Sequence, residues 1–151
     1  DTFAANAEKK AIEVARATSC YALADDSGLV VDALDGAPGI YSARYAGVDA
    51  TDKANLEKVL TQLADTQKNE RTARFQCVIS LATPQGGVES FSGTVEGQIS
   101  ETPQGNNGFG YDPVFVPEGH DITFAQMGGE QKDTMSHRGR ALLAFSQGWK
   151  P

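Results

Sequence analysis

The chain has 151 residues, a hydrophobic content of 40% and a formal net charge of −7, from 13 basic and 20 acidic side chains. This length and composition suit one packed domain and argue against a disordered chain. The acidic balance argues against a protein that slides along nucleic acid, which requires many Lys and Arg side chains; aliphatic runs such as 78–82 are too short to cross a bilayer.

The first half of the chain predicts alternating helices and strands. Apolar residues spaced by three and four favour a helix capped by Asp1 or Thr2, and a second apolar stripe follows Thr51. Turn-forming residues interrupt the strand pattern at 27–28. In chain order we predict a helix over 2–18, strands over 21–26 and 29–34, an irregular loop over 35–47 and a helix over 51–64.

The second half predicts a hairpin, a glycine-rich loop and a final helix. Phe75, Cys77 and Ile79 occupy alternate positions, which is the period of a half-buried strand. We predict a strand over 74–82, an antiparallel return over 88–99, a loop entering a short strand over 105–115 and a helix from Ser136. The whole pattern is that of an α/β protein.

The first candidate site is the DDSG segment at 25–28, at the end of a predicted strand. Because neighbouring side chains of a strand point to opposite faces, Asp25 and Asp26 would lie on different faces. Asp26 would share its face with Ala22 and Ala24, whose small side chains would leave room for a ligand. The alternative is an ordinary turn, which these residue types also favour.

The second candidate site is the loop GNNGFGYDPVF at 105–115. Its glycines let the backbone approach a ligand, Phe109 offers a stacking face, and Asp112 can accept a hydrogen bond from a base. The alternative is a hairpin loop with Phe109 in the core. The loop matches neither a Walker loop nor a Rossmann fingerprint.

The third candidate site is Lys132 with His137-Arg138, where Ser136 can cap a helix. Helix N-termini attract anions, and basic residues there are slightly unfavourable for the helix itself, which indicates a functional reason for them. The alternative is a solvated basic turn. Together the three candidates predict a nucleotide bound with a divalent cation, since Mg²⁺ typically binds one or two carboxylates plus substrate phosphates.

Four segments resemble, in order and spacing, the inosine triphosphate pyrophosphatase family, also called XTP/dITP diphosphatases. They are TFAANAEKKA at 2–11, ALADDSGLVVDALDGAPGIYSARYAG at 22–47, GNNGFGYDPVF at 105–115 and KDTMSHRGRAL at 132–142. The resemblance covers essentially the whole chain. It implies an elongated α/β structure in which a long mixed sheet, flanked by helices, floors a cleft between two lobes, and it implies a homodimer.

The resemblance also implies an activity. Family members hydrolyse the non-standard purine nucleotides ITP, dITP and XTP to the monophosphate and pyrophosphate with Mg²⁺, which cleanses the nucleotide pool. The implied partner is a small purine nucleoside triphosphate, without nucleic acid or a membrane. Because a carboxylate is a weak base for water, we expect activity that rises toward alkaline pH and is lost with EDTA.

The family's site residues carry over position by position. Asp26 would bind the magnesium and act as the base for the attacking water, and Arg138 would help to read the 6-keto group of the purine. The other implied substrate contacts are Lys10 at the triphosphate, Ser27, Phe109 stacked on the purine, Gly110, Tyr111 and Asp112 lining the pocket, and Lys132 and His137 on the base and ribose side.

One departure from the family concerns the start of the chain. Family members begin earlier, with a strand, a Ser/Thr-x-Asn-x-x-Lys turn that grips the triphosphate, and an acidic residue before Asp1 that helps to hold the metal. We therefore interpret 1–151 as a single domain, N-terminally truncated relative to the family. The alternatives are a nucleotide-binding fragment with little or no catalysis, a binding or oligomer-forming module, and a pyrophosphatase for a different nucleotide.

The two cysteines give an indication of the cellular compartment. Cys20 and Cys77 lie far apart, with no C-x-x-C motif and no neighbouring His. This predicts two reduced core residues in a cytoplasmic protein. No apolar run of the kind found in signal peptides opens the sequence.

Overall fold

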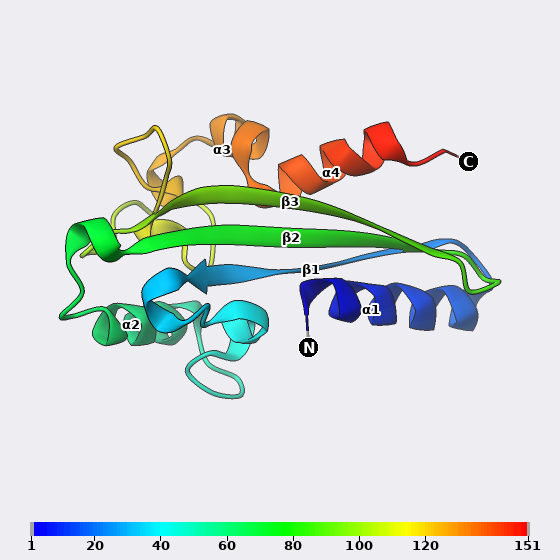
Figure 1. Ribbon diagram of the computed structural model, residues 1–151, viewed down its shortest axis with the longest axis horizontal. Coiled ribbons are helices and arrows are strands. Elements are labelled where there is room, and N and C mark those ends of the chain that lie inside the picture. The colour runs from blue at the N-terminus through cyan, green and yellow to red at the C-terminus, as the bar shows by residue number, and fades with distance from the viewer. Residues whose placement is uncertain (1, 151) are drawn as a thin grey trace.

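The computed structural model describes residues 2–150 as a long, twisted antiparallel sheet flanked by helices (Figure 1). Strand order follows chain order, β1-β2-β3-β4. The elements are α1 (Phe3–Thr18), β1 (Ala22–Val31), α2 (Asp52–Gln62), β2 (Thr72–Ala82), β3 (Val88–Ile99), β4 (Phe115–Pro117), α3 (Gly129–Met135) and α4 (His137–Gly148), with short 3₁₀ turns between them.

The predicted α/β class with an elongated sheet and flanking helices is confirmed. β1 pairs with β2 over ten residues, β2 with β3 over eleven, and β3 with β4 over three. Every one of these pairings is antiparallel, so the parallel pairs that a mixed sheet requires are absent from residues 2–150.

The two faces of the sheet carry different helices. Even-numbered residues of β1 face α1, where Ala22 packs with Ala11 and Ala15. Odd-numbered residues of β1 share their face with Cys77 and with Ile79, which packs against α4. Figure 1 shows α1 below the sheet and α4 above it, and we call these sides the α1 face and the α4 face.

The main core fills the other end of the sheet. Odd-numbered residues of β1 and β2, such as Leu29 and Phe75, meet the apolar stripe of α2 and the segment 111–127. The rings of Phe75, Phe115 and Phe124 lie 4.6–6.0 Å apart. This core holds the glycine-rich loop near β1, the strand that carries both aspartates.

Most predicted elements are confirmed within a few residues. Thr2 and Thr51 cap α1 and α2, and Ser136 caps α4; Asp1, the other predicted cap, lies outside the described residues. The helix α3 was not predicted. None of the helices in residues 2–150 combines the length and apolar character needed to span a membrane.

Two further predictions were wrong. The strands expected over 21–26 and 29–34 form one strand, β1, because Ser27 and Gly28 pair with β2 without interruption. A Cβ on Gly28 would lie 2.5 Å from the Gly39 carbonyl oxygen, so the glycine serves a close approach rather than a turn. Cys77 is buried as predicted, but Cys20 is exposed because it lies in the connection between α1 and β1.

Candidate active site

Asp26 lies on the α1 face, where two residues of α1 bind its carboxylate. Oδ1 accepts a hydrogen bond from Lys10 Nζ at 2.8 Å, and Oδ2 accepts one from Asn6 Nδ2 at 3.0 Å. Lys10 Nζ also donates to the backbone carbonyl of Asp25 at 3.0 Å. Asn6 and Lys10 are four residues apart in α1, so both side chains project from the same side of the helix.

The residues around Asp26 fit a magnesium ion that completes its shell with phosphates and water. The Asp26 side chain is 18% exposed, and each of its oxygens retains a second acceptor direction beside its present hydrogen bond. Residues 2–150 contain no group of three or more His, Cys, Asp or Glu side chains that could enclose a metal. One carboxylate with substrate oxygens is a donor set that Mg²⁺ accepts.

The small residues beside Asp26 have another purpose than the one predicted. Ala22 and Ala24 pack against the alanines of α1 and bring the helix close to the strand. This contact buries Ala22 and leaves Ala24 partly exposed. It also places Lys10 within reach of Asp26.

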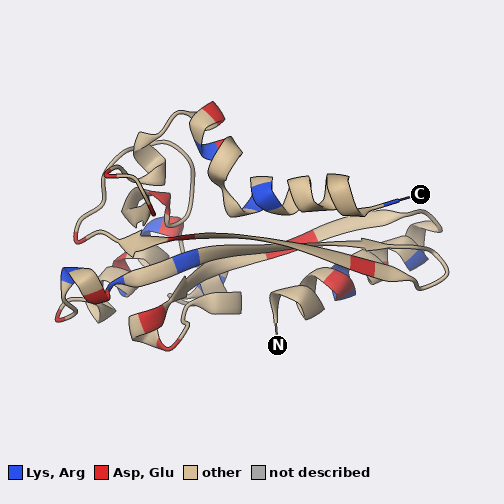
Figure 2. Ribbon diagram, turned by 45° about the horizontal axis from the view of Figure 1, so that its top comes forward, with Lys and Arg blue, Asp and Glu red and all other residues tan. Residues whose placement is uncertain are grey.

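Asp25 lies on the opposite face, as the strand period predicts. Its Oδ2 accepts a hydrogen bond from Arg138 Nη2 at 2.9 Å, at the start of α4. This bond raises the pKa of the Arg138 guanidinium above its ordinary value, so the side chain stays charged. Figure 2 shows basic residues of α4 on one side of the sheet and the charged residues of α1 on the other.

A cavity of about 180 Å³ lies beside Ser27, at the end of the α4 face that joins the main core. It is smaller than the roughly 300–1,000 Å³ of typical ligand sites, so it suits one ring system rather than a whole nucleotide. Six of the predicted site residues line it, together with residues of β1, β2, α2 and the 39–44 turn. The six are Ser27, Phe109, Gly110, Tyr111, Asp112 and His137.

Phe109 is exposed at this cavity, with 61% of its surface accessible. This excludes the alternative in which Phe109 belongs to the core. Lys132 Nζ lies 4.9 Å from the centre of the Phe109 ring, a cation–π distance. The ring is therefore held in place and still open to a stacking partner.

Asp112 is buried and organises the glycine-rich loop. Its Oδ2 accepts a hydrogen bond from the Phe109 backbone N–H at 3.0 Å and forms an ion pair with Lys132. Gly108 has a φ of +73°, and a Cβ there would overlap the Asp112 carboxylate. Asp112 was predicted to accept from a base, and in the structure its carboxylate is already engaged by the protein.

Tyr111 and Gly110 anchor the same loop to other elements. The Tyr111 hydroxyl is buried and donates to the Ser42 carbonyl oxygen at 2.7 Å, and burial raises its pKa. The Gly110 backbone N–H donates to Asp52 Oδ2 at 2.9 Å. Asp52 thus ties the loop to the first turn of α2.

His137 presents an unpartnered nitrogen inside the molecule. The residue is 8% exposed, its ring stacks on Phe75 at 4.8 Å, and its buried Nδ1 has no hydrogen-bond partner. Burial lowers the pKa of His137 to about 4, with further contributions from Arg138 and Lys132. His137 thus lines the cavity as a neutral imidazole, and its buried Nδ1 is a polar atom without a hydrogen-bond partner.

The low pKa of His137 predicts acid-sensitive stability. Between pH 6.5, the ordinary pKa of His, and pH about 4, the unfolded chain binds a proton at this residue that the folded chain does not. The contribution of neutral His137 to the free energy of unfolding is therefore fully present above pH 6.5 and is lost as the pH falls toward 4. We expect the loss to be on the order of 3 kcal/mol by pH 4. Denaturant unfolding at several pH values should show it.

The matched variant is His137→Phe, which keeps a ring against Phe75 and removes the titrating nitrogens. Its free energy of unfolding should fall less between pH 7 and pH 4 than that of the unmodified chain. His120→Gln, at the only other histidine, should keep the original slope. If the free energy of unfolding fell equally with pH in all three proteins, His137 would not be the origin of the acid sensitivity.

The predicted residues thus form two groups around β1. Lys10 and Asp26 lie on the α1 face, and the cavity residues with Lys132 lie on the α4 face. Arg138 contacts Asp25 in a neighbouring hollow that it lines with Leu142 and Ile79. Within residues 2–150, β1 pairs with no strand other than β2, and its outer edge at 29–31 is bonded instead by the 36–42 segment, through the Val30–Pro38 bridge and the Ser42 hydroxyl.

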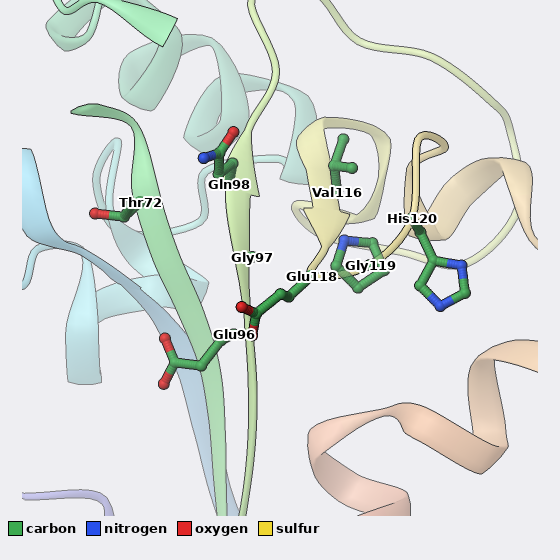
Figure 3. Close-up of a pocket in the computed structure, with 9 residues that line it drawn as sticks. Thr72, Glu96, Gly97, Gln98, Val116, Glu118, Gly119 and His120 are labelled. Atoms are coloured by element: carbon green, nitrogen blue, oxygen red, sulfur yellow. The ribbon is translucent and has the colours of Figure 1, made fainter. Parts of the chain in front are cut away.

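A larger hollow of about 440 Å³ lies away from both groups, over β3 and β4 (Figure 3). It contains none of the predicted site residues, and its charged side chains are the carboxylates Glu96 and Glu118. These would repel a triphosphate. Its lining residues are Thr72, Glu96, Gly97, Gln98, Val116, Pro117, Glu118, Gly119 and His120.

Three contributing residues were missed from the sequence. Asn6 lies one helical turn before Lys10, and that spacing was the available signal. Asp52 follows the cap of a helix and resembles any acidic residue of a first turn. Asp25 was set aside in favour of Asp26, and only the position of α4 reveals its contact with Arg138.

Comparison with known proteins identifies a family for the chain. The profile of the Ham1 family matches residues 1–148. The dITP/XTP pyrophosphatase of Geobacter sulfurreducens is 50% identical over 151 residues, which are 99% of this chain and 76% of that protein.

Two solved structures superpose closely. A HAM1 protein from Coxiella burnetii has a TM-score of 0.92 and 44% identity, covering 97% of this chain and 75% of its own. The Ham1 protein of Staphylococcus aureus has a TM-score of 0.91 and 48% identity, covering 99% and 79%.

Proposed function

The chain belongs to the Ham1 family, and on that premise we propose that it is a hydrolase that cleaves dITP, XTP and ITP to the monophosphate and pyrophosphate. The relatives named dITP/XTP pyrophosphatase supply the substrate class. The order of the motifs and their arrangement around β1 support the same assignment.

The observation that carries the proposal is a ring-sized cavity lined by the exposed Phe109 and by His137, whose buried Nδ1 has no hydrogen-bond partner. An aromatic face and a free polar nitrogen are what a flat heterocycle with polar edges requires. The purine would stack on Phe109 and bind its edge to His137. The ribose would then leave the cavity past Ser27.

From Ser27 the triphosphate would cross the edge of β1 to Asp26 and Lys10. Lys10 Nζ lies within hydrogen-bond distance of two acceptors, and it would exchange one of them for a phosphate oxygen. Asp26 would accept the proton of the attacking water. A Mg²⁺ ion held by Asp26 would neutralise phosphate charge and make a water more acidic.

Selection against adenine nucleotides would depend on hydrogen-bond donors of the protein that face position 6 of the purine. A guanidinium can only donate hydrogen bonds, so Arg138 pairs with the oxygen of a 6-keto purine and finds no acceptor in a 6-amino group. A buried donor without a partner costs binding energy. This is the role we propose for Arg138.

The experiment is a hydrolysis assay on dITP, XTP, ITP and dATP with separate detection of pyrophosphate and inorganic phosphate. We expect pyrophosphate from the first three, and much slower release from dATP. Inorganic phosphate as the first product would contradict the proposal. Tight dITP binding without any product would favour the alternative, a nucleotide-binding module without catalysis.

Chelation with EDTA should abolish hydrolysis, and added Mg²⁺ should restore it. Among the described residues, Lys10 is the only cation that forms an ion pair with the Asp26 carboxylate, which is little positive charge for a triphosphate on a protein of net charge −7. Pyrophosphate release over a Mg²⁺ titration measures the effect. Undiminished release in EDTA would remove the metal from the proposal.

The family resemblance extends the proposal to a cytoplasmic homodimer that removes deaminated purines from the nucleotide pool. Light scattering coupled to size-exclusion chromatography tests the dimer, with a mass of twice 16.0 kDa as the expected result.

A further inference from the structure

Arg138 is the second residue of α4, and one carboxylate holds its side chain. Nη2 donates to Asp25 Oδ2 at 2.9 Å, and the two side chains are 44% and 42% exposed. Cys77 Sγ lies 4.0 Å from the same Asp25 oxygen. One hydrogen bond therefore holds the guanidinium over β1 and β2, where it stays partly exposed.

This position is next to the base cavity. Ser27, the next residue of β1 on the same face as Asp25, lines the cavity, and so does His137, which precedes Arg138 in α4. Arg138 thus lies beside two residues that line the cavity, Ser27 on β1 and His137 on α4.

The same arrangement recurs at each cation that we expect to meet substrate. Lys10 pairs with Asp26, and Lys132 pairs with Asp112. Asp26 and Asp112 already belong to the predicted site, whereas Asp25 has no role in it. Asp25 cannot share a metal ion with Asp26, because the two side chains leave β1 on opposite faces.

We propose that Asp25 is a positioning residue that holds Arg138 beside the base cavity, and that it thereby contributes to the selection of 6-keto over 6-amino purines. This inference rests on the proposed function. An arginine side chain has many rotamers, and ordering it only when substrate arrives would weaken binding. The Asp25 carboxylate offsets part of that cost, because it already holds one guanidinium nitrogen before substrate arrives.

The test is equilibrium binding of dITP and dATP by calorimetry in EDTA, so that no hydrolysis and no metal is needed. Asp25→Asn keeps the size of the side chain and the backbone carbonyl that binds Lys10. We expect the ratio of the dATP and dITP dissociation constants to fall about tenfold. Asp25→Glu should recover part of the ratio, and Asp25→Ser serves as a second variant if Asp25→Asn is unfolded by circular dichroism.

A double-mutant cycle shows whether Asp25 acts through Arg138. In an Arg138→Ala background, Asp25→Asn should change the ratio by less than about twofold. The control is Asp32→Asn, which breaks a pair of the same length, 2.9 Å, with Arg74 on the α1 face. It should leave the ratio unchanged.

The outcomes separate the inference from the function on which it rests. Equal binding of dITP and dATP by the unmodified chain would overturn the proposed selectivity, and the inference with it. A selective chain whose Asp25→Asn variant is equally selective would overturn the inference alone. So would tighter dITP binding by that variant, or an undiminished effect in the Arg138→Ala background.

Discussion

Asp26→Asn should lower kcat for dITP hydrolysis by about 10²–10⁴-fold, the range expected when a general base is removed. The amide keeps the size of the carboxylate and loses the charge that binds Lys10 and that would bind a metal. The free energy of unfolding should change by less than about 1 kcal/mol, since the lost ion pair is partly solvated. Pyrophosphate release under saturating dITP and Mg²⁺ measures the effect.

The control for this variant is again Asp32→Asn. Asp32 follows β1 and binds Arg74 and Thr72, away from the site residues, so its replacement should leave kcat unchanged. If Asp26→Asn kept full activity, Asp26 would be neither base nor metal ligand. If both variants lost activity equally, the loss would reflect the fold rather than the site.

Gly93→Ala should strongly destabilise the fold. Gly93 is on β3 under α4, where an added Cβ would overlap the His137 carbonyl oxygen and the Ala141 backbone nitrogen. Backbone atoms cannot move away by a side-chain rotation, so α4 as a whole must shift. We expect a loss of about 3 kcal/mol, which in a chain of this size lowers Tm by about 10 °C.

The same substitution should also weaken binding of the base, because α4 carries His137 and Arg138. Thermal unfolding and dITP binding, measured together, check both effects. Gly129→Ala is the matched control, since an added Cβ there meets no atom within 4 Å; Tm should change by about 1 °C or less. An unchanged Tm for Gly93→Ala would show that the helix does not rest on this glycine.

The sequence predicted local structure well where one period dominates. The alternation of β2 and the cap-and-stripe pattern of α2 led directly to the observed elements. It failed at Ser27-Gly28, where turn-forming residues lie inside a strand. The reason is tertiary, since Gly28 lets the 39–44 turn approach the strand, which no local pattern reveals.

The sequence predicted which residues belong to the candidate site, but it did not predict how they are arranged in space. The motif resemblance identified Phe109 and His137, and the structure adds that both line one cavity. The engagement of Asp112 by Lys132 and the contact of Asp52 with Gly110 join residues 20 and 58 positions apart. Such contacts depend on packing between elements, so spacing along the chain carries no sign of them.

The alanine contact between α1 and β1 has a consequence for strand registration. Slipping β1 by one residue against its neighbours would exchange the faces of all its side chains. Leu23 would then meet the fully buried alanines of α1, Ala7, Ala11 and Ala15, where only a methyl group fits. This contact therefore fixes the register of β1, and with it the faces of the two adjacent aspartates: Asp26 faces Lys10, and Asp25 faces Arg138.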